Sequence, residues 1–122
     1  IPVKEKITYR ELLKHNSINC SSVVIRTDVA REFPMEHDDS HEDYITWLRI
    51  LRKGGFAAGI NRPYLKYRLS EGGKSRNKLK SAAMTYQVYR YVGYGPLKSL
   101  FFFASYANLL CFPPFSHLPY EV

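Results

Sequence analysis

The residues best equipped for chemistry in this chain gather in one short acidic stretch ahead of a helical pattern. Carboxylates and imidazoles at this density can bind a metal ion, stabilise the start of a helix, or accept a proton from a substrate. The side chains concerned are His37, Asp38, Asp39, His41, Glu42 and Asp43. Their spacing narrows the choice among these three kinds of chemistry.

A metal site built from this stretch alone is disfavoured, because neither the H-E-x-x-H zinc spacing nor the EF-hand calcium pattern occurs. Spacing alone favours helix stabilisation, since Glu42 and Asp43 would lie at the positive end of the helix dipole, worth about 0.3–1 kcal/mol each. Catalysis is the third interpretation. A carboxylate at a helix N-terminus stays ionised at neutral pH and can take the proton of a hydroxyl that attacks an electrophilic carbon.

The element that must position these carboxylates is a helix that begins directly after them. Ser40 suits an N-cap position, and Asp43 three residues later resembles a capping box. Apolar residues then recur at helical spacing, and Gly54 with Gly55 supplies a stop. The stripe consists of Tyr44, Trp47, Leu48 and Leu51.

The remaining elements follow from the same patterns. Residues 7–15 predict a short helix, the β-branched run Val23–Ile25 predicts a strand, and Thr27 or Asp28 can cap a helical turn that Pro34 ends. Residues around 61–69 read as extended segments and a strand. Two long helices follow, one from Ser75 to about Tyr91 and one from Pro96 to Phe112, which is shorter than a bilayer crossing requires. The apolar stripe expected on the first is Leu79, Ala82, Ala83, Tyr86 and Tyr89 or Arg90.

Charge is distributed unevenly over the 122 residues, whose formal net charge is +7. Residues 1–43 carry six basic and nine acidic side chains, whereas residues 44–122 carry twelve basic and two acidic ones. The second half therefore either faces an anionic partner or presents a solvated basic surface. Cys20 and Cys111 form no C-x-x-C pair. They fit buried thiols in a reducing compartment as well as one disulfide, and free thiols are favoured. Residues 1–11 show no signal peptide.

The stretch "SHEDYITWLRILRKGG" resembles the ED motif of the family-two inverting glycosyltransferases, which have the GT-A fold. The match covers the run from His41 to Tyr44 and then Trp47, Leu48 and Arg49. The later segment "INRPYLKYRLSEGGKSRNK" resembles the Y-R…S block of that family at Leu65, Tyr67, Arg68 and Ser75. The resemblance extends over most of residues 7 to about 90.

The resemblance implies an α/β fold, seen here as an α+β fragment: the C-terminal, acceptor-side portion of a GT-A domain with few short strands and three main helices. Residues 1–95 would form this part, and 96–122 an apolar helix with a Pro-rich tail. Asp43 would be the general base, and Glu42 would orient it or contact the acceptor. The residues that would contact the acceptor or the donor diphosphate are His41, Tyr44, Trp47, Arg68, Lys74, Ser75 and Arg76.

The nucleotide-binding half expected of such an enzyme is missing, and no D-x-D metal motif occurs. No metal ligand is therefore assigned, although the resemblance implies Mg²⁺ or Mn²⁺ in the full-length enzyme. Without the metal and the phosphate contacts the leaving diphosphate is not stabilised, and base catalysis alone contributes only about 10²–10⁴-fold. The chain alone is therefore expected to be inactive. Apolar surface that the missing half would cover favours self-association.

The implied partners are a nucleotide-diphosphate sugar and a glycan or lipid-linked acceptor, at the cytoplasmic side of the plasma membrane. The helix from Pro96 either lies on the membrane or packs on the catalytic domain. Two alternative functions remain: a non-catalytic basic module that binds an anionic partner through residues 74–80, and a membrane-peripheral interaction protein. Nucleic acid is not expected as the partner, because no DNA- or RNA-binding motif occurs and the aromatic residues interleave with apolar ones.

Overall fold

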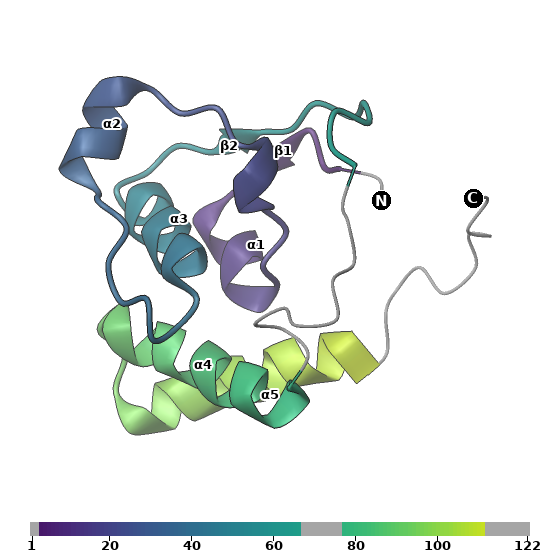
Figure 1. Ribbon diagram of the computed structural model, residues 1–122. Helices are drawn as coiled ribbons and strands as arrows, with labels where there is room; N and C mark the ends of the chain where they lie inside the picture. Colours follow the sequence, from purple (N-terminus) through teal and green to yellow (C-terminus); the bar gives the residue numbers. More distant parts are fainter. Residues whose placement is uncertain (1–2, 67–76, 112–122) are drawn as a thin grey trace.

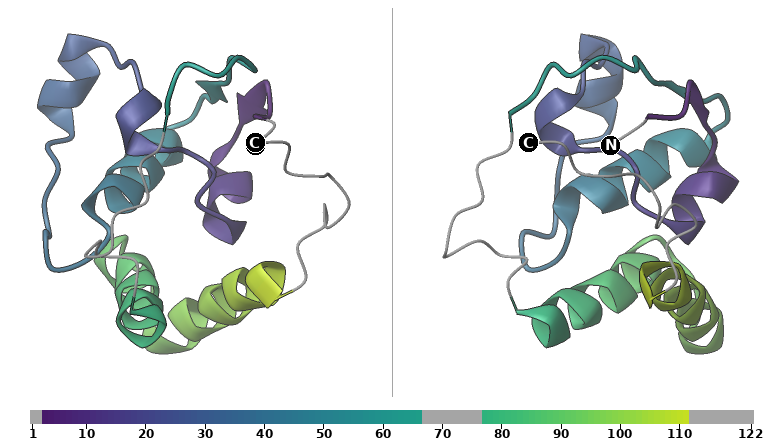
Figure 2. Two further views of the ribbon diagram at one scale, coloured as in Figure 1. Left: turned by 45° about the vertical axis from the view of Figure 1, so that its right-hand side comes forward. Right: turned by 90° about the vertical axis from the view of Figure 1, so that its right-hand side faces the viewer.

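The computed structural model describes residues 3–66 and 77–111, with side chains described as far as residue 108. Its helices are α1 (Tyr9–Lys14), α2 (Thr27–Glu32), α3 (Glu42–Arg52), α4 (Lys78–Tyr91) and α5 (Pro96–Cys111), with a 3-10 turn η1 at Cys20–Ser22. The strands β1 (Lys6–Ile7) and β2 (Ala57–Ala58) pair antiparallel. Helices α4 and α5 form a layer at one end, and α1, α3 and the β-ribbon lie above it (Figures 1 and 2).

This arrangement agrees with the expected fragment of mixed class, with few short strands and three main helices. The domain boundary at residue 95 stays a prediction. The expected helix at residues 7–15 is confirmed as α1, and the expected helical turn near Thr27 is confirmed as α2. Thr27 and Asp28 lie inside α2 rather than at its cap, which is Arg26.

One hydrophobic core joins α1, α3, α4 and the β-ribbon. The predicted stripe of α3 supplies its centre, since Tyr44 and Leu48 are at most 1% exposed. Leu12 of α1 and Val88 of α4 meet them there, and neither is exposed at all. Burying each such side chain contributes roughly 1.5–3 kcal/mol. The core is completed by Ile7, Leu13, Ile45, Trp47, Leu51, Tyr89 and Val92.

Two buried tyrosine hydroxyls fix the C-terminal end of α1. The Tyr44 hydroxyl donates to the Leu12 carbonyl at 2.6 Å, and the Tyr89 hydroxyl donates to the Leu13 carbonyl at 2.8 Å. The last carbonyls of a helix have no partner within the helix, so a buried helix end needs such donors. Burial raises the pKa of both phenols, that of Tyr89 to about 12. Both therefore stay protonated and able to donate across the physiological range.

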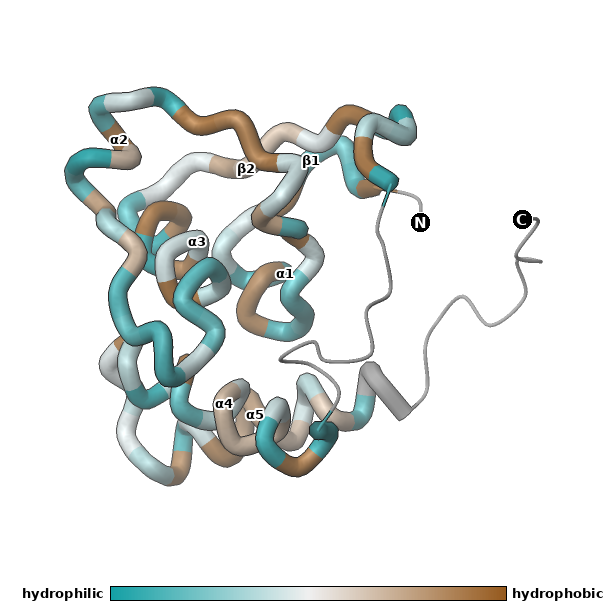
Figure 3. The backbone as a smooth tube through the Cα atoms, in the orientation of Figure 1, coloured by the Kyte–Doolittle hydropathy of each residue, from teal (hydrophilic) through white to brown (hydrophobic). Residues whose placement is uncertain are grey.

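The predicted strand at Val23–Ile25 is wrong. Val23 has an extended backbone, but residues 23–25 join no ladder within the described part of the chain, and Val24 is 100% exposed. Figure 3 shows this hydrophobic stretch as a brown tube leading into α2. β-branched residues favour a pleated, packed surface, and no strand of the described chain lies beside these three to provide it. The strand expected near Tyr64 and Leu65 is also absent, while Tyr67 and Leu69 lie outside the described residues.

The expected register of α4 is wrong as well. Leu79 is 85% exposed, and the helix buries Met84, Thr85 and Val88, which were not expected. Of the expected stripe, Tyr89 is buried as predicted. Thr85 can be buried because its hydroxyl donates to the Ser81 carbonyl at 2.9 Å. The core contacts the second half of α4. The apolar residues in the first turns of α4 therefore do not determine which face of this helix is buried. The helix begins after Asn77, whose side chain accepts from the Lys80 amide; the expected start, Ser75, lies outside the described residues.

The turn between α4 and α5 follows the expected pattern. Gly93 has φ +105°, a conformation that a side chain disfavours, and the Tyr94 amide donates back to the Tyr89 carbonyl at 3.0 Å. Pro96 opens α5 as expected, because its missing N–H costs nothing at a first helical position. No helix within residues 3–66 and 77–111 combines the length and apolarity needed to cross a bilayer.

The β-ribbon requires a glycine at position 59. The Gly59 amide donates to the Glu5 carbonyl at 2.9 Å, and a Cβ built on Gly59 would lie 2.1 Å from the Lys4 carbonyl oxygen. Only a residue without a side chain lets the two backbones approach this closely.

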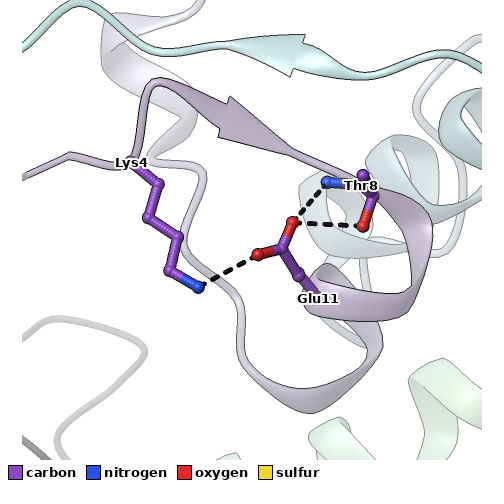
Figure 4. Close-up of polar contacts among 3 residues, drawn as sticks. All are labelled: Lys4, Thr8 and Glu11. Atoms are coloured by element: carbon purple, nitrogen blue, oxygen red, sulfur yellow. Dashed lines mark hydrogen bonds and ion pairs between the residues drawn. The ribbon is translucent and has the colours of Figure 1, made fainter.

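Glu11 anchors the start of α1 (Figure 4). Its carboxylate accepts from the Thr8 amide at 3.0 Å and the Thr8 hydroxyl at 3.1 Å, and it pairs with Lys4 at 3.1 Å. These bonds, that of the Thr8 amide foremost, lower the pKa of Glu11 to about 2. The ionised form is therefore the one that stabilises the fold.

We expect Glu11→Gln to destabilise the chain at pH 7, and the difference from wild type to shrink as the pH falls from about 4.5 towards about 2. The sign follows from the lowered pKa, because the stabilisation is complete above the unfolded value and lost on protonation. Urea unfolding of both proteins at several pH values measures it. The exposed Glu5→Gln serves as control, and a wild-type advantage that stays constant down to pH 2 would contradict the assignment.

Candidate active site

The first turn of α3 carries the acidic pair that the sequence singles out. His41 is the N-cap residue, and the Ile45 amide donates to its carbonyl at 3.1 Å, the first hydrogen bond of the helix. His41, Glu42 and Asp43 are all half-buried. The negative side chains thus lie beside the unpaired amides of the helix start, where the dipole stabilises their charge.

The loop before α3 is held against α4. His37 stacks on Tyr91 with ring centroids 3.9 Å apart, and the Tyr91 hydroxyl donates to Asp39 at 2.7 Å. Ser40 is fully buried, and its hydroxyl donates to the Met84 carbonyl at 2.8 Å. The expected capping role of Ser40 is therefore wrong, because its hydroxyl is used to attach the loop to α4. These contacts fix the position of the loop that leads into the acidic pair.

His37 has a positive φ of 66°, which is uncommon for a residue with a side chain. The Tyr91 ring contact and a turn bond from the Ser40 amide to the His37 carbonyl, at 3.0 Å, hold it there. Such conformations persist where the surroundings fix them. Here the contacts with Tyr91 and Ser40 also determine how the loop leads into α3.

The Asp43 carboxylate is constrained but not enclosed. Its Oδ1 accepts from the Tyr44 amide at 2.8 Å, and no other hydrogen bond to it is found within the described part of the chain. The next turn is reinforced by the Thr46 hydroxyl, which donates to the Glu42 carbonyl at 2.8 Å. A half-buried carboxylate with one backbone donor keeps lone pairs with which to accept a further proton.

Two side chains from distant parts of the chain lie close to the acidic pair. Partial desolvation of the thiol by its neighbours, then the negative charge of Asp43 and that of Glu42, raise the pKa of Cys20 in η1. Burial and then the charge of Asp43 raise the pKa of Tyr106 in α5. The Tyr106 ring also lies 6.3 Å from that of Tyr44 and 5.8 Å from that of His15, between centroids. The site is therefore formed where η1, the end of α1, the start of α3 and α5 meet.

The sequence analysis did not assign Cys20, Tyr106 or His15 to the site. Cys20 is a free, exposed thiol rather than the buried one expected. Tyr106 lies in an apolar run in which nothing distinguishes it from its aromatic neighbours. Only the packing of α5 on α1 and α4 brings it to the acidic pair.

The two aromatic residues proposed to contact a sugar are part of the core. Tyr44 is 1% exposed and Trp47 is 6% exposed, so neither presents an open ring face in this structure. The Tyr44 hydroxyl is used by α1, as described above. The indole nitrogen of Trp47 is buried and has no hydrogen-bond partner among residues 3–66 and 77–111. Their burial shows that the aromatic residues of the motif pack α3 against the core.

The residues expected on the diphosphate side are Arg68, Lys74, Ser75 and Arg76, and they all lie outside the described residues. Lys78 and Lys80, which begin α4, are exposed. No group of three or more metal-binding side chains is present in residues 3–66 and 77–111 as far as they are described. The structure thus brings together His41, Glu42 and Asp43, and the donor side stays a prediction.

Three curated proteins are similar to this chain, and all three are glycosyltransferases. The chain is 37% identical over 90 residues to a Bacillus subtilis protein named as a teichuronic acid biosynthesis glycosyltransferase, TuaG. It is 35% identical over 106 residues to WfgD of Escherichia coli, a UDP-Glc:alpha-D-GlcNAc-diphosphoundecaprenol beta-1,3-glucosyltransferase. WfaP of Escherichia coli, which has the same described activity, is 33% identical over 88 residues.

These matches cover 74%, 84% and 72% of this chain but only 36%, 40% and 35% of the three relatives. No protein-family model and no solved structure matches the chain. The identities over most of its length nevertheless agree with the resemblance of its ED stretch. The chain is homologous to a part, somewhat more than a third in length, of bacterial glycosyltransferases.

Proposed function

We propose that this chain is the acceptor-side part of a family-two, GT-A-type inverting glycosyltransferase. The full-length enzyme would transfer a sugar from a nucleotide-diphosphate donor to a hydroxyl acceptor in surface polysaccharide or glycolipid synthesis. The support comes from the three related transferases and from the acidic first turn of α3.

The position of Asp43 is the observation that carries the proposal. A general base must be charged, rigidly held and within reach of the hydroxyl that it deprotonates. Asp43 lies in the first turn of a helix whose entry loop is attached to α4 by Ser40 and His37. Its carboxylate is half-buried and is engaged by one amide among the described residues.

The neighbouring residues take supporting roles in this proposal. Glu42 orients the acceptor or the base, and His41 contacts the acceptor from the cap position. Arg68, Lys74, Ser75 and Arg76 contact the donor diphosphate, for which charge-assisted hydrogen bonds from Arg are well suited. Tyr44 and Trp47 act through α3 rather than by touching the sugar, because both are buried. Mg²⁺ or Mn²⁺ belongs to the remainder of the full-length enzyme.

A direct test compares the longer protein that contains this chain with the 122 residues alone. Both are incubated with nucleotide-diphosphate sugars, including UDP-glucose, and with a polyprenyl-diphosphate GlcNAc acceptor at the inner face of a membrane preparation. We expect transfer by the longer protein only. Transfer by the 122 residues would show that the remainder of the longer protein is not needed to supply the metal and the donor contacts. Absence of transfer from every donor by the folded longer protein would contradict the proposed reaction.

We also propose that the isolated chain associates with a second copy through Val23–Ile25. Ten consecutive uncharged residues, 16–25, contain neither proline nor glycine. Their last three are β-branched, the backbone of Val23 is extended, and Val24 is fully exposed. An exposed segment of this kind is a template for pairing with another strand.

Val24→Lys is accordingly expected to shift the isolated chain towards the monomer, because a charge in an edge strand opposes pairing. Analytical ultracentrifugation over a concentration series measures the shift. Met35→Lys, at a side chain 47% exposed outside this segment, is the matched control. A wild-type chain that is monomeric at every concentration would refute the association.

A further inference from the structure

Helix α5 has two faces with different surroundings. Its inner face packs on the rest of the molecule: Ser99 is fully buried, and Phe102 and Phe103 contact rings of α4. Its outer face is apolar and open, with Leu97 84%, Leu100 55% and Phe101 70% exposed. These three recur at helical spacing, so they lie on one side of the helix. An apolar face of this kind on an end helix marks a contact surface.

The charges around this face have one sign. Residues 78–111 contain four basic side chains and no acidic one. All four are exposed, and they belong to the adjacent helices, three to α4 and one to α5. Figures 1 and 2 show these helices side by side, as the layer at one end of the molecule. The four residues are Lys78, Lys80, Arg90 and Lys98.

The same helix reaches the candidate active site with its inner face. Tyr106 of α5 lies close enough to Asp43 for that charge to raise its pKa, and its ring lies beside that of Tyr44. Two of the related enzymes act on acceptors attached to diphosphoundecaprenol, which is a lipid. An enzyme that uses an acceptor of this class must hold its base near a membrane surface.

We infer that the outer face of α5 lies in the interface of an anionic lipid bilayer. Leu97, Leu100 and Phe101 enter the boundary between headgroups and acyl chains, parallel to the surface, as the apolar side of an interfacial helix does. The basic side chains of the α4–α5 layer contact anionic headgroups. Asp43 then lies on the membrane-distal side of α5, where the headgroup-linked sugar of a lipid acceptor can reach it. Only this last step rests on the proposed function.

The test is co-sedimentation of the 122-residue chain with vesicles, without donor or acceptor. Vesicles containing phosphatidylglycerol are compared with vesicles of phosphatidylcholine alone. The test variant is Leu97→Gln with Phe101→Gln. The matched control is Phe56→Gln with Ile60→Gln, whose side chains are 53% and 67% exposed. The two residues flank β2, which Figure 1 shows at the end of the molecule away from α4 and α5. Circular dichroism confirms that each variant folds.

We expect the wild-type chain to bind the anionic vesicles, with the partition coefficient reduced about tenfold or more in the α5 variant, the loss expected when two large apolar side chains no longer insert. The control variant should bind as wild type does. No binding to anionic vesicles at low salt, or equal binding by the α5 variant, overturns the inference. So does an α5 variant that alters the oligomeric state without lipid, because the face would then be a protein interface.

The two proposals fail in distinguishable ways. Asp43→Asn should bind vesicles like wild type, since the carboxylate takes no part in the contact. If vesicle binding is absent while the longer protein transfers sugar, only the membrane contact is wrong. If binding is present and transfer is absent, only the proposed function is wrong.

Discussion

Asp43→Asn in the full-length enzyme is expected to lower the rate of sugar transfer by between about 10²- and 10⁴-fold, the usual contribution of a positioned general base. Asparagine keeps the size of the side chain, and its amide oxygen can still accept from the Tyr44 amide as Asp43 does at 2.8 Å. It cannot take up the proton of the acceptor. The loss therefore appears in turnover and leaves the fold intact, as initial rates and thermal unfolding of both proteins will show.

The matched control is Asp28→Asn. Asp28 also lies in the first turn of a helix, but it is exposed and pairs with Arg26 at 2.9 Å. An exposed substitution of this kind has little effect on stability, so the rate of transfer should stay within about twofold of wild type. Glu42→Gln should give an intermediate loss, because Glu42 is proposed to orient rather than to accept the proton. Equal losses at Asp28 and Asp43 would point to a general effect of charge.

Tyr44→Ala is expected to destabilise the chain by about 3–5 kcal/mol, the range for truncating a buried aromatic side chain. The ring is 1% exposed at the centre of the core, and its removal leaves a cavity between α1, α3 and α4. The variant also removes the donor of a 2.6 Å hydrogen bond to the Leu12 carbonyl. Small domains have about 5–15 kcal/mol of stability in all, so a large part of the free energy of unfolding is lost.

Tyr44→Phe separates the two effects, because it keeps the ring and removes only the hydroxyl. It should cost about 1–3 kcal/mol, the desolvation penalty of leaving the buried carbonyl unpaired. Tyr64→Ala, at a side chain 71% exposed, is the control and should change stability little. Urea unfolding of the four proteins measures all three differences. A Tyr44→Phe variant as stable as wild type would refute the hydroxyl's part in holding α1.

Local patterns in the sequence predicted most of the helices. The stripe of α3 is confirmed because Tyr44, Leu48 and Leu51 are all buried, and Pro96 opens α5 as expected. The start of α3 was placed one position too early in the chain. Ser40 is a residue type that often caps helices. Its hydroxyl instead donates to the buried carbonyl of Met84, 44 residues away. Competition between a local and a distant acceptor cannot be read from spacing.

The other errors have the same origin. Val23–Ile25 has the composition of a strand, but strand formation depends on a neighbour that the described chain does not place there. Leu79 was assigned to the core of α4 by hydropathy, whereas packing against α3 and α5 turned Thr85 inwards. Tyr106 joins the site only through the fold. The acidic pair itself was found because its chemistry, its spacing and its helix are all local.

The most direct measurement of the central claim is the single-turnover rate of sugar transfer by full-length wild type and Asp43→Asn, with donor and acceptor both saturating. Under these conditions substrate binding and product release drop out, and the rate reports the step in which the acceptor hydroxyl loses its proton. We predict that this rate falls at least about 100-fold in the variant while acceptor affinity is retained. A variant whose single-turnover rate matches wild type would show that the carboxylate of Asp43 only stabilises the start of α3.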